Sequence, residues 1–457
     1  MSKIAILGAG ESGVGAALLA KKQGLDVWVS DAGTIAPAYK AELKDHQIAF
    51  EEGQHTFDRI LTAQEVIKSP GISNEIPLIQ AAKQANIPVL SEIELASRYT
   101  TAKCIGITGS NGKTTTAHLT YHLLRQAGVE VVLAGNVGIS FARCVAEGQP
   151  DYYVLELSSF QLENIEKFRV DIACLLNITP DHLDRYQGQM DLYVSAKFNL
   201  LRNMAAEGSV VYNHDDPYTQ GRMVEAPSGL TRYPISLQIP VVPGAYAQNG
   251  SLRCILSSSQ VSIAQAHLKL LGQHNQYNAL AAMTIAGLVG IAPSAIKQGL
   301  ATFVGIPHRL EWVATIREID IYNDSKATNI AATAAALASI DRPIVWIAGG
   351  VDKGNEYATL HSLVAERVKA LVCLGKDNAK LLQSFTGKLK HTYTTQYVEQ
   401  AVNQALAWAS PGDVVLLSPA CASFDLFESF EQRGEAFKEA VRATRAFYEA
   451  NTSATAH

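Results

Sequence analysis

The residues best suited to phosphate chemistry lie in one glycine-rich segment, GITGSNGKTTT, at residues 106–116. The segment follows the apolar run KCIGI and precedes a helical pattern, so its backbone N–H groups can surround phosphate oxygens. Lys113 can reach the β and γ phosphates of a nucleotide, and the hydroxyl of Thr114 can bind Mg²⁺. The pattern departs from G-x-x-x-x-G-K-[ST] because Ile107 stands at its first glycine, but a turn without a ligand would not need a lysine and a threonine there. The expected nucleotide contacts are Gly109, Ser110, Asn111, Gly112, Lys113, Thr114 and Thr115.

Three further residues could complete a metal site beside this loop. Glu156 ends the strand-like run DYYVLE, and a carboxylate at a strand end beside a phosphate loop is a suitable Mg²⁺ ligand. His182 follows the apolar run DIACLLN and falls at the same edge of such a sheet, although a lone histidine is more often a hydrogen-bonded structural residue. Lys197, in YVSAKFNLL, has a plainer alternative as a solvated lysine on a helix surface.

A second glycine loop, GAGESG, follows the strand-like run KIAIL near the N-terminus. Its glycines fit G-x-G-x-x-G, and Asp31 ends the next apolar run, about twenty residues later. Glycines let the backbone approach a pyrophosphate, and the acid can bind ribose or base. The pattern predicts a site for a diphosphate nucleotide, and either a dinucleotide such as NAD or a UDP-sugar would supply both groups. A tight turn that binds nothing is the remaining alternative.

To bring these residues to one edge of a sheet, the chain needs strands and helices in alternation. Apolar runs do alternate with helical patterns, which predicts βαβ units and mostly parallel sheets whose ligands bind at the carboxyl ends of the strands. The predicted strands are KIAILG, LDVWVS, KCIGITG, DYYVLELSS, DIACLLNIT, IVWIAGG, KALVCLG and DVVLLSP. Each glycine loop opens a unit, and a further set of elements begins after HRLEW (308–312). Residues 221–265 are rich in Pro, Gly, Ser and Val and predict small strands joined by turns.

Composition argues against several classes of protein. The 457 residues are 47% hydrophobic, enough for several cores, and the formal net charge of −5 without a basic block argues against nucleic-acid binding. The longest apolar stretch, at 280–292, is too short for a membrane span, and no signal-peptide pattern opens the sequence. The six cysteines form no CxxC pair, so we expect buried thiols in a reducing compartment. The expected location is the cytoplasm.

Together, the motifs resemble those of the ATP-dependent Mur ligase family. The resemblance rests on GAGESG, SPGI, TGSNGKTTT, GNVG, LELSSFQLE, NITPDHLDR, AKFN, GQHNQYN, HRLE, NDSKATN, GGVDKG and LSPACASFDLFESFEQRG, which run along the whole chain. TGSNGKT is shared with folylpolyglutamate synthetases, whereas LSSFQLE, NDSKATN and ACASFD look like the branch that adds D-glutamate. A sister ligase that adds another amino acid is the nearest alternative. A P-loop nucleotide switch and an NAD-dependent dehydrogenase, the latter favoured by GAGESG alone, are more distant ones.

The resemblance implies an α/β fold of three domains. These are a Rossmann-like UDP-binding domain (1–92), a central P-loop ATPase domain with a small extra β region (93–303), and a Rossmann-like amino-acid-binding domain (304–457). The implied substrates are UDP-N-acetylmuramoyl-L-alanine, D-glutamate and ATP, and the implied enzyme is a monomer. The L-alanyl carboxylate is first activated as an acyl phosphate and then joined to the amine of D-glutamate. Both steps build negative charge on oxygen, which the protein must stabilise.

The resemblance also assigns residues to each ligand. Thr114 and Glu156 would hold a first Mg²⁺, and His182 and Lys197 a second; because an ammonium group cannot bind a cation, Lys197 must be carbamylated by CO₂. The residues implied to contact the sugar nucleotide are Ser12, Asp31, Gly71 and Asn136, with Ser158 and Gln161 as further substrate contacts. Those implied to contact ATP outside the glycine loop are Asn275, Asn278, Arg309 and Asp324.

D-glutamate carries two carboxylates, so its site needs a cation and several neutral donors. The motifs of the third domain follow apolar strands, where ligands of such sheets bind. The expected contacts are Thr328, Lys353, Ser423, Phe424 and Phe430, with Lys326 nearer the phosphate. The alternative for Thr328 and for Ser423 is helix capping.

Overall fold

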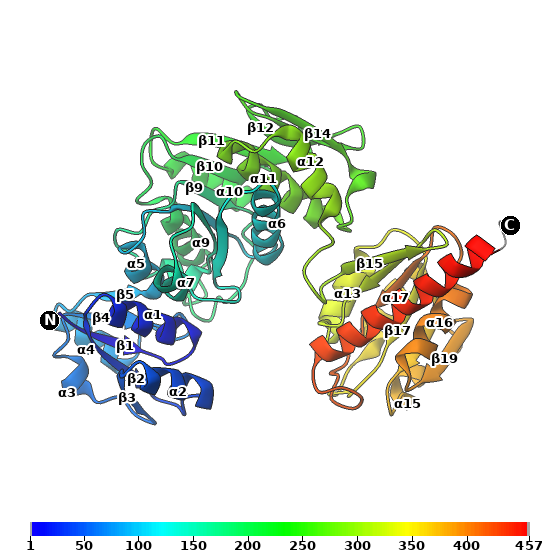
Figure 1. The fold of residues 1–457 in the computed structure, drawn as a ribbon, viewed down its shortest axis with the longest axis horizontal. Helices are drawn as coiled ribbons and strands as arrows, with labels where there is room; N and C mark the ends of the chain where they lie inside the picture. The colour runs from blue at the N-terminus through cyan, green and yellow to red at the C-terminus, as the bar shows by residue number, and fades with distance from the viewer. Residues whose placement is uncertain (1, 455–457) are drawn as a thin grey trace. The chain divides into compact units, whose positions relative to one another are not determined.

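The computed structural model describes residues 2–454, and the side chains of residues 2–449. The chain forms two compact units: residues up to 267 with 276–300 make the first, and residues 268–275 with those from 301 onward make the second. The first unit contains two sheets and the second contains one, and helices flank each of them (Figure 1). This architecture confirms the predicted α/β fold class with its mostly parallel sheets.

The first sheet has the strand order β3-β2-β1-β4-β5, and every neighbouring pair in it is parallel. Its strands are β1 (Lys3–Leu7), β2 (Asp26–Asp31), β3 (Ala49–Glu52), β4 (Glu65–Lys68) and β5 (Val89–Ser91). The helices among them are α1 (Glu11–Lys22), α2 (Pro37–Asp45), α3 (Phe57–Ile60), α4 (Pro77–Gln84) and α5 (Glu92–Ser97). Because β1 is central, the glycine loop after it lies between the carboxyl ends of β2 and β4.

Strand β1 is apolar throughout because both faces of its sheet are covered. Ile4 and Ile6 pack in one cluster of buried side chains, whereas Ala5 and Leu7 pack in another. Successive residues of a strand point to opposite faces, so a strand buried on both faces shows no alternation of apolar and polar residues.

The second sheet has the order β14-β13-β12-β11-β10-β9-β6-β8-β7. Its strands are β6 (Lys103–Thr108), β7 (Val131–Gly135), β8 (Tyr152–Glu156), β9 (Ile172–Leu175), β10 (Ser209–Asn213), β11 (Thr231–Ser236), β12 (Gly244–Gln248), β13 (Ser251–Ile255) and β14 (Gln260–Ala264). The pairs from β7 to β12 are parallel, and β12 to β14 form an antiparallel meander. The predicted small β region therefore extends one edge of the central sheet.

The helices that accompany this sheet connect its parallel strands or follow its last strand. They are α6 (Lys113–Gln126), α7 (Phe141–Glu147), α8 (Ser159–Leu162), α9 (Met190–Phe198), α10 (Pro217–Arg222), α11 (Gln273–Val289) and α12 (Pro293–Thr302). Short 3₁₀ helices occupy Asn199–Leu201, Met223–Glu225 and Gln265–His267. Strand β6 lies between β8 and β9, so the loops after these three strands meet at one edge.

The sheet of the second unit has the order β15-β16-β20-β17-β18-β19. Its strands are β15 (Glu311–Ile316), β16 (Ile319–Asn323), β17 (Ile344–Ala348), β18 (Val368–Leu374), β19 (His391–Thr395) and β20 (Val414–Leu417). Its helices are α13 (Ile330–Ala338), α14 (His361–Arg367), α15 (Ala379–Phe385), α16 (Val398–Trp408) and α17 (Phe430–Ala454), with a 3₁₀ helix at Tyr357–Leu360. Strands β15 and β16 form an antiparallel hairpin, and the remaining pairs are parallel.

The apolar runs predicted to be strands are strands in the structure, namely β1, β2, β6, β8, β9, β17, β18 and β20. All six cysteines are free and buried, which confirms the prediction of buried thiols. Within residues 2–454 no helix combines the length and the low polarity that crossing a bilayer requires.

Candidate active site

The glycine loop after β6 leads directly into helix α6, as a phosphate-binding loop does. Gly112, the residue before the helix, has a φ of 84°, which L side chains rarely adopt. The Nζ of Lys113 donates hydrogen bonds to the carbonyl oxygens of Gly109 at 2.9 Å and Ser110 at 2.8 Å. The ammonium group is thus folded over its own loop, beside the positive end of the helix dipole. The arrangement concentrates positive charge where a polyphosphate would lie.

Residues that follow β9 hold this loop in shape. The backbone N–H of Ser110 donates to the carbonyl of Asn177 at 2.7 Å, and the Ser110 hydroxyl donates to the carbonyl of Thr179 at 2.9 Å. The N–H of Asn111 donates to Oδ1 of Asn177 at 2.9 Å. The hydroxyl of Tyr193, from α9, lies 3.0 Å from that of Ser110. The loop is therefore braced by the neighbouring strand end and by α9.

Glu156, at the end of β8, is placed to hold a divalent cation beside this loop. Its side chain is buried, and Oε1 accepts a hydrogen bond from Nδ2 of Asn136 at 2.8 Å. Its Oε2 is buried and has no hydrogen-bond partner among the described residues. An anionic oxygen left without a partner in the protein interior is costly, and a hard cation would satisfy it. Burial lowers the pKa of Lys113, and the charge of Glu156 opposes that shift.

Lys197 reaches the same loop from α9 and is only 2% exposed. Its Nζ donates to the carbonyl of Gly109 at 2.8 Å, so it shares this acceptor with Lys113. Burial, and then the charge of Lys113, lower the pKa of Lys197 to about 7, with Asp181 opposing the shift. The alternative interpretation of Lys197 as a solvated surface lysine is therefore wrong.

His182 lies in the loop after β9, with a φ of 52° and a side chain that is 54% exposed. Its Nε2 is 3.5 Å from Oδ2 of Asp181, and its ring centroid is 5.0 Å from that of Phe160. No hydrogen bond or ion pair joins His182 to Lys197 or Glu156 in the part of the chain that the structure describes. Among the described side chains, no group of three or more His, Cys, Asp and Glu residues is placed to hold a metal ion by itself. A metal ion at this edge would therefore draw on hydroxyl and phosphate oxygens as well.

The N-terminal glycine loop has the close packing that its pattern predicts. A Cβ at Gly13 would lie 1.8 Å from the carbonyl oxygen of Gly8, so α1 can approach β1 only with glycine there. Asp31, at the end of β2, accepts from the N–H of Ala9 at 2.7 Å and from that of Gly33 at 2.8 Å. Ser12 is partly exposed in the first turn of α1. The loop is therefore preformed at the carboxyl edge of its sheet.

The other residues expected to contact the sugar nucleotide have structural partners already. The carbonyl of Gly71 accepts from Arg185, and Asn136 joins Glu156 through both its backbone N–H and its side chain. Ser158 and Gln161 form a capping box at the start of α8, because each side chain bonds the other residue's backbone. These bonds fix the four residues in place around the carboxyl ends of β4, β7 and β8.

Of the residues expected to contact ATP outside the loop, Asn278 lies beside it. The hydroxyl of Thr116 donates to Oδ1 of Asn278 at 3.1 Å, and a Cβ at Gly112 would lie 2.4 Å from the same oxygen. Asn275, Arg309 and Asp324 belong to the second unit. Asp324 is buried, accepts from the Ser418 hydroxyl at 2.9 Å, and has its pKa raised to about 7 by burial.

Of the residues expected to bind the amino acid, Phe430 begins α17, and the others lie on loops that follow three adjacent strands, β16, β20 and β17. Thr328 is partly exposed, Ser423 is buried, and Phe424 is 67% exposed. Lys353 is exposed with its Nζ 5.9 Å from the Phe424 ring centroid, and Lys326 lies 5.3 Å from that of Phe430. Asn329 caps α13, so the helix-capping alternative for Thr328 is wrong. No helix begins at Ser423 either.

Arg433, which sequence reasoning missed, ties these loops together from α17. Its guanidinium donates to the backbone carbonyls of Ser325, Gly349 and Cys421 at 2.9, 3.4 and 3.1 Å, and to the Ser325 hydroxyl at 3.0 Å. The side chain is 2% exposed, and burial lowers its pKa to about 10. It lies in the motif FESFEQRG, but residue type alone does not separate a buried arginine from a solvated one on a polar helix.

Comparison with protein families matches most of the chain in three consecutive parts. Residues 2–91 match the family described as Mur ligase MurD-like, N-terminal domain. Residues 107–286 match the Mur ligase middle domain, and residues 308–421 match the Mur ligase, glutamate ligase domain.

Curated proteins with high similarity share one name, UDP-N-acetylmuramoylalanine–D-glutamate ligase. The protein of that name from Christiangramia forsetii is 46% identical over 440 residues, which cover 96% of this chain and 99% of the relative. Those from Bacteroides fragilis and Porphyromonas gingivalis are 48% and 47% identical, and cover 97% and 96% of this chain and 100% and 98% of their own lengths.

Solved structures with the same fold are more distant in sequence. A UDP-N-acetylmuramoyl-L-alanyl-D-glutamate–2,6-diaminopimelate ligase superposes with a TM-score of 0.59 at 16% identity, covering 92% of both chains. A UDP-N-acetylmuramate-alanine ligase from Thermotoga maritima gives a TM-score of 0.54 at 18% identity, covering 97% of this chain and all of that one. At these identities the likeness shows the fold alone.

Proposed function

The chain belongs to the Mur ligase family, and we propose that it is the member that adds D-glutamate to UDP-N-acetylmuramoyl-L-alanine in peptidoglycan synthesis. The observation that carries the proposal is the identity of 46–48% to ligases of that name over nearly the full length of both chains. Mur ligases depend on ATP and Mg²⁺, and the loop between β6 and α6 is suited to both. We further propose that the enzyme acts as a monomer in the cytoplasm.

In the first step, an oxygen of the L-alanyl carboxylate forms a bond to the γ-phosphorus of ATP while the bond from that phosphorus to ADP breaks. Lys113 would exchange the carbonyls of Gly109 and Ser110 for oxygens of the transferring phosphoryl group. In the second step, the amine of D-glutamate attacks the acyl carbonyl, loses a proton, and phosphate leaves. The chain mainly positions the reactants and stabilises charge on oxygen.

Thr114 and Glu156 would hold one Mg²⁺, and His182 with carbamylated Lys197 a second, and these ions would neutralise charge on the phosphates. The buried oxygen of Glu156 that lacks a partner fits this role. Asn136 would orient the Glu156 carboxylate through their hydrogen bond. These metal-ligand roles belong to the proposal, because membership of the family does not by itself assign them.

Carbamylation of Lys197 needs a neutral amine, which forms an N–C bond to CO₂ and releases a proton. Because the pKa of Lys197 is lowered to about 7, a large fraction of its side chain is neutral near neutral pH. The product is a carboxylate-like group at the carbonyl of Gly109, where two ammonium groups otherwise share one acceptor. The negative charge of the carbamate would attract the Lys113 ammonium group, in place of the repulsion between the two ammonium groups.

The proposed contacts to ATP outside the glycine loop and to D-glutamate come from residues in the motifs of the second unit and of α11. Asn275, Asn278, Arg309 and Asp324 would contact ATP, and Lys326 would lie near the phosphate. The buried Asn278, already bonded to Thr116, supports the nucleotide assignment for this end of α11. For D-glutamate, Lys353 would pair with a carboxylate, Thr328 and Ser423 would donate hydrogen bonds, and Phe424 and Phe430 would contact the methylene groups.

Phosphate release across a panel of amino acids tests the function directly. With ATP, Mg²⁺ and UDP-N-acetylmuramoyl-L-alanine present, release should require D-glutamate and should not occur with L-glutamate, L-lysine or meso-diaminopimelate. Release that required a different amino acid would identify a sister ligase instead. Release with ATP alone would favour a nucleotide switch without ligase chemistry.

Replacing Lys353 by alanine should raise the KM for D-glutamate and leave those for ATP and the sugar nucleotide nearly unchanged. No carboxylate pairs with Lys353 among the residues that the structure describes, so its charge is available to a ligand. A charge-assisted hydrogen bond is worth about 1.5 to 3 kcal/mol, so the rise should be roughly 10- to 100-fold. Steady-state kinetics with each substrate varied in turn measures all three constants.

Lys380→Ala is the matched control, because Lys380 lies nearby but already pairs with Asp352 at 3.2 Å. It should leave the KM for D-glutamate within about twofold. An equal rise of all three constants in Lys353→Ala would point to a general distortion, and an unchanged KM for D-glutamate would remove Lys353 from the pocket.

A further inference from the structure

A network of polar side chains joins the loop after β4 to two loops of the second sheet. The loop at residues 69–75 contains Gly71, one of the expected sugar-nucleotide contacts. Arg185 donates to the carbonyl of Gly71 at 3.3 Å through Nη1 and to that of Ile72 at 3.0 Å through Nη2. One guanidinium group therefore binds two successive carbonyls of this loop.

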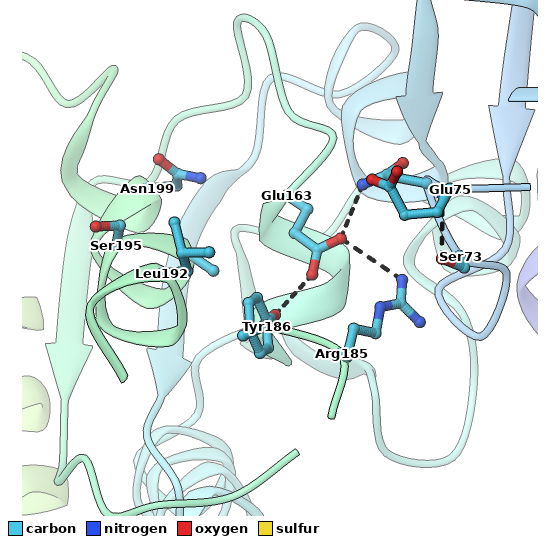
Figure 2. Close-up of a pocket in the computed structure, with 10 residues that line it drawn as sticks. Ser73, Glu75, Glu163, Arg185, Tyr186, Leu192, Ser195 and Asn199 are labelled. Carbon is cyan, nitrogen blue, oxygen red and sulfur yellow. Dashed lines mark hydrogen bonds and ion pairs between the residues drawn. The ribbon is translucent and has the colours of Figure 1, made fainter. Parts of the chain in front are cut away.

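Glu163, which follows α8, is the anion at the centre of the network. It accepts hydrogen bonds from Nδ2 of Asn74 at 2.9 Å and from the hydroxyl of Tyr186 at 2.6 Å, and its Oε2 lies 3.5 Å from Nη2 of Arg185. The side chains of Glu163 and Arg185 are each 15% exposed. Figure 2 shows Glu163 between Tyr186 and Arg185. These three residues line a cavity of about 300 Å³.

Glu163 balances two cations that share one acceptor. Lys68, the last residue of β4, is 1% exposed and donates to the carbonyl of Ile72 at 2.7 Å, the same oxygen that Arg185 binds. Burial, and then the charge of Arg185, lower the pKa of Lys68 to about 8, with the charge of Glu163 opposing the shift. Without the charge of Glu163, the two cations would repel each other across the carbonyl of Ile72.

The loop that this network holds packs against the N-terminal glycine loop. A Cβ at Gly8 would lie 2.5 Å from the Ser69 hydroxyl oxygen, so the two loops are in direct contact. That hydroxyl is buried and has no hydrogen-bond partner among the residues whose side chains are described. A shift of residues 69–72 would therefore move groups that face the expected diphosphate.

Arg185 lies in the same loop as His182, after β9, and its guanidinium also packs against Phe160 of α8. The guanidinium carbon is 4.1 Å from the ring centroid of Phe160, and the backbone N–H of Arg185 donates to the carbonyl of His182 at 3.0 Å. Arg185 thus links the loop at residues 69–75 to the loop that contains His182, an expected metal ligand.

We propose that Arg185 and Glu163 are a pair of positioning residues that fix the loop at 69–75 for the sugar-nucleotide substrate. The pair does not contact the reacting atoms and acts through the carbonyls of Gly71 and Ile72. The proposal rests on the proposed function, since it names the substrate whose site the pair shapes.

The test compares Arg185→Lys, Glu163→Gln and the double variant with the wild-type enzyme. Lysine keeps the charge of Arg185 but cannot bind two carbonyls in a fixed fork, and glutamine keeps the shape of Glu163 without its charge. The adjacent cavity leaves room for the shorter lysine and for the neutral glutamine, so neither substitution should cause a clash. The measurements are kcat and the KM of each substrate, together with the Kd of UDP by calorimetry.

Each single variant should raise the KM for the sugar nucleotide and the Kd of UDP by about tenfold, the factor expected from loss of one hydrogen bond to a charged group. The KM values for ATP and D-glutamate should stay within twofold. The double variant should be little worse than either single one, because residues that act as a unit are not additive.

Arg98→Lys is the matched control. Arg98 binds both carboxylate oxygens of Glu65, at 3.0 and 2.9 Å, so it makes a comparable ion pair at the opposite end of β4 without touching the loop. It should leave the KM for the sugar nucleotide unchanged. An equal increase in Arg98→Lys, or no increase in Arg185→Lys, would overturn the proposal. If the wild-type enzyme does not use D-glutamate, the proposed function is contradicted but the proposal for Arg185 and Glu163 is not. The Kd of UDP in the variants still tests that proposal.

Discussion

Replacement of Lys113 by alanine is expected to abolish product formation. The Lys113 ammonium group lies over the carbonyls of Gly109 and Ser110 at the N-terminus of α6, where the phosphates of ATP would bind. Phosphoryl transfer depends on neutralising charge that spreads over the equatorial oxygens, and loss of one such cation costs about 10³-fold or more in kcat. Phosphate release and formation of the amide product measure the loss together.

Lys103→Ala is a suitable control for this substitution. Lys103 begins β6, at the other end of the strand that leads into the loop, and its exposed Nζ lies 5.7 Å from the Tyr152 ring centroid. That variant should keep nearly full activity. Among the described residues, Lys113 donates hydrogen bonds to carbonyls of its own loop alone, so its removal should leave the fold intact, which circular dichroism can verify. Full activity in Lys113→Ala would exclude the loop as the site of phosphoryl transfer.

Lys197→Ala should lose activity by about 10²-fold or more, and added acetate or formate should restore part of it. The substitution removes a group that we propose becomes a metal-binding carboxylate, and an electrostatic stabiliser of that kind is worth about 10²- to 10³-fold. Because Lys197 is buried, truncation leaves an enclosed space next to Gly109 that a small carboxylate can enter. Activity titrated with acetate measures the restoration.

Carbon-13 NMR with labelled bicarbonate gives an independent measurement of the modified lysine. The wild-type enzyme should show a carbamate signal that is absent from Lys197→Ala. The exposed Lys167, in the loop between α8 and β9, serves as the control position, and Lys167→Ala should be active without acetate and should retain the signal. An unmodified Lys197 in the active enzyme, together with no restoration by carboxylates, would exclude carbamylation.

The buried strands and both glycine loops could be predicted from the sequence because each has a strong local signal. Strands β1, β6 and β20 are buried on both faces and appear as unbroken apolar runs. Strands β3 (AFEE) and β19 (HTYTT) lie at sheet edges, carry polar residues, and give no such signal. The edge strands of the parallel sheets were therefore harder to predict than the central ones.

The surroundings of the charged side chains could not be predicted from the sequence. Lysine and arginine are mostly solvated, so residue type alone does not predict that Lys197 and Arg433 are buried. Their surroundings come from segments distant in the chain, such as Gly109 for Lys197 and Gly349 for Arg433. The spacing of Ser158 and Gln161 fits a capping box, so the sequence carries a signal for this structural role that is independent of substrate contact.

Because its six thiols are buried, the chain is suited to site-specific labelling at an introduced cysteine. All six are buried, and burial raises the pKa of every one of them, so the reactive thiolate is scarce at neutral pH. A maleimide reagent should therefore modify the folded chain slowly. A single cysteine introduced at an exposed position on either unit would then take up a fluorophore selectively, with every native cysteine left in place.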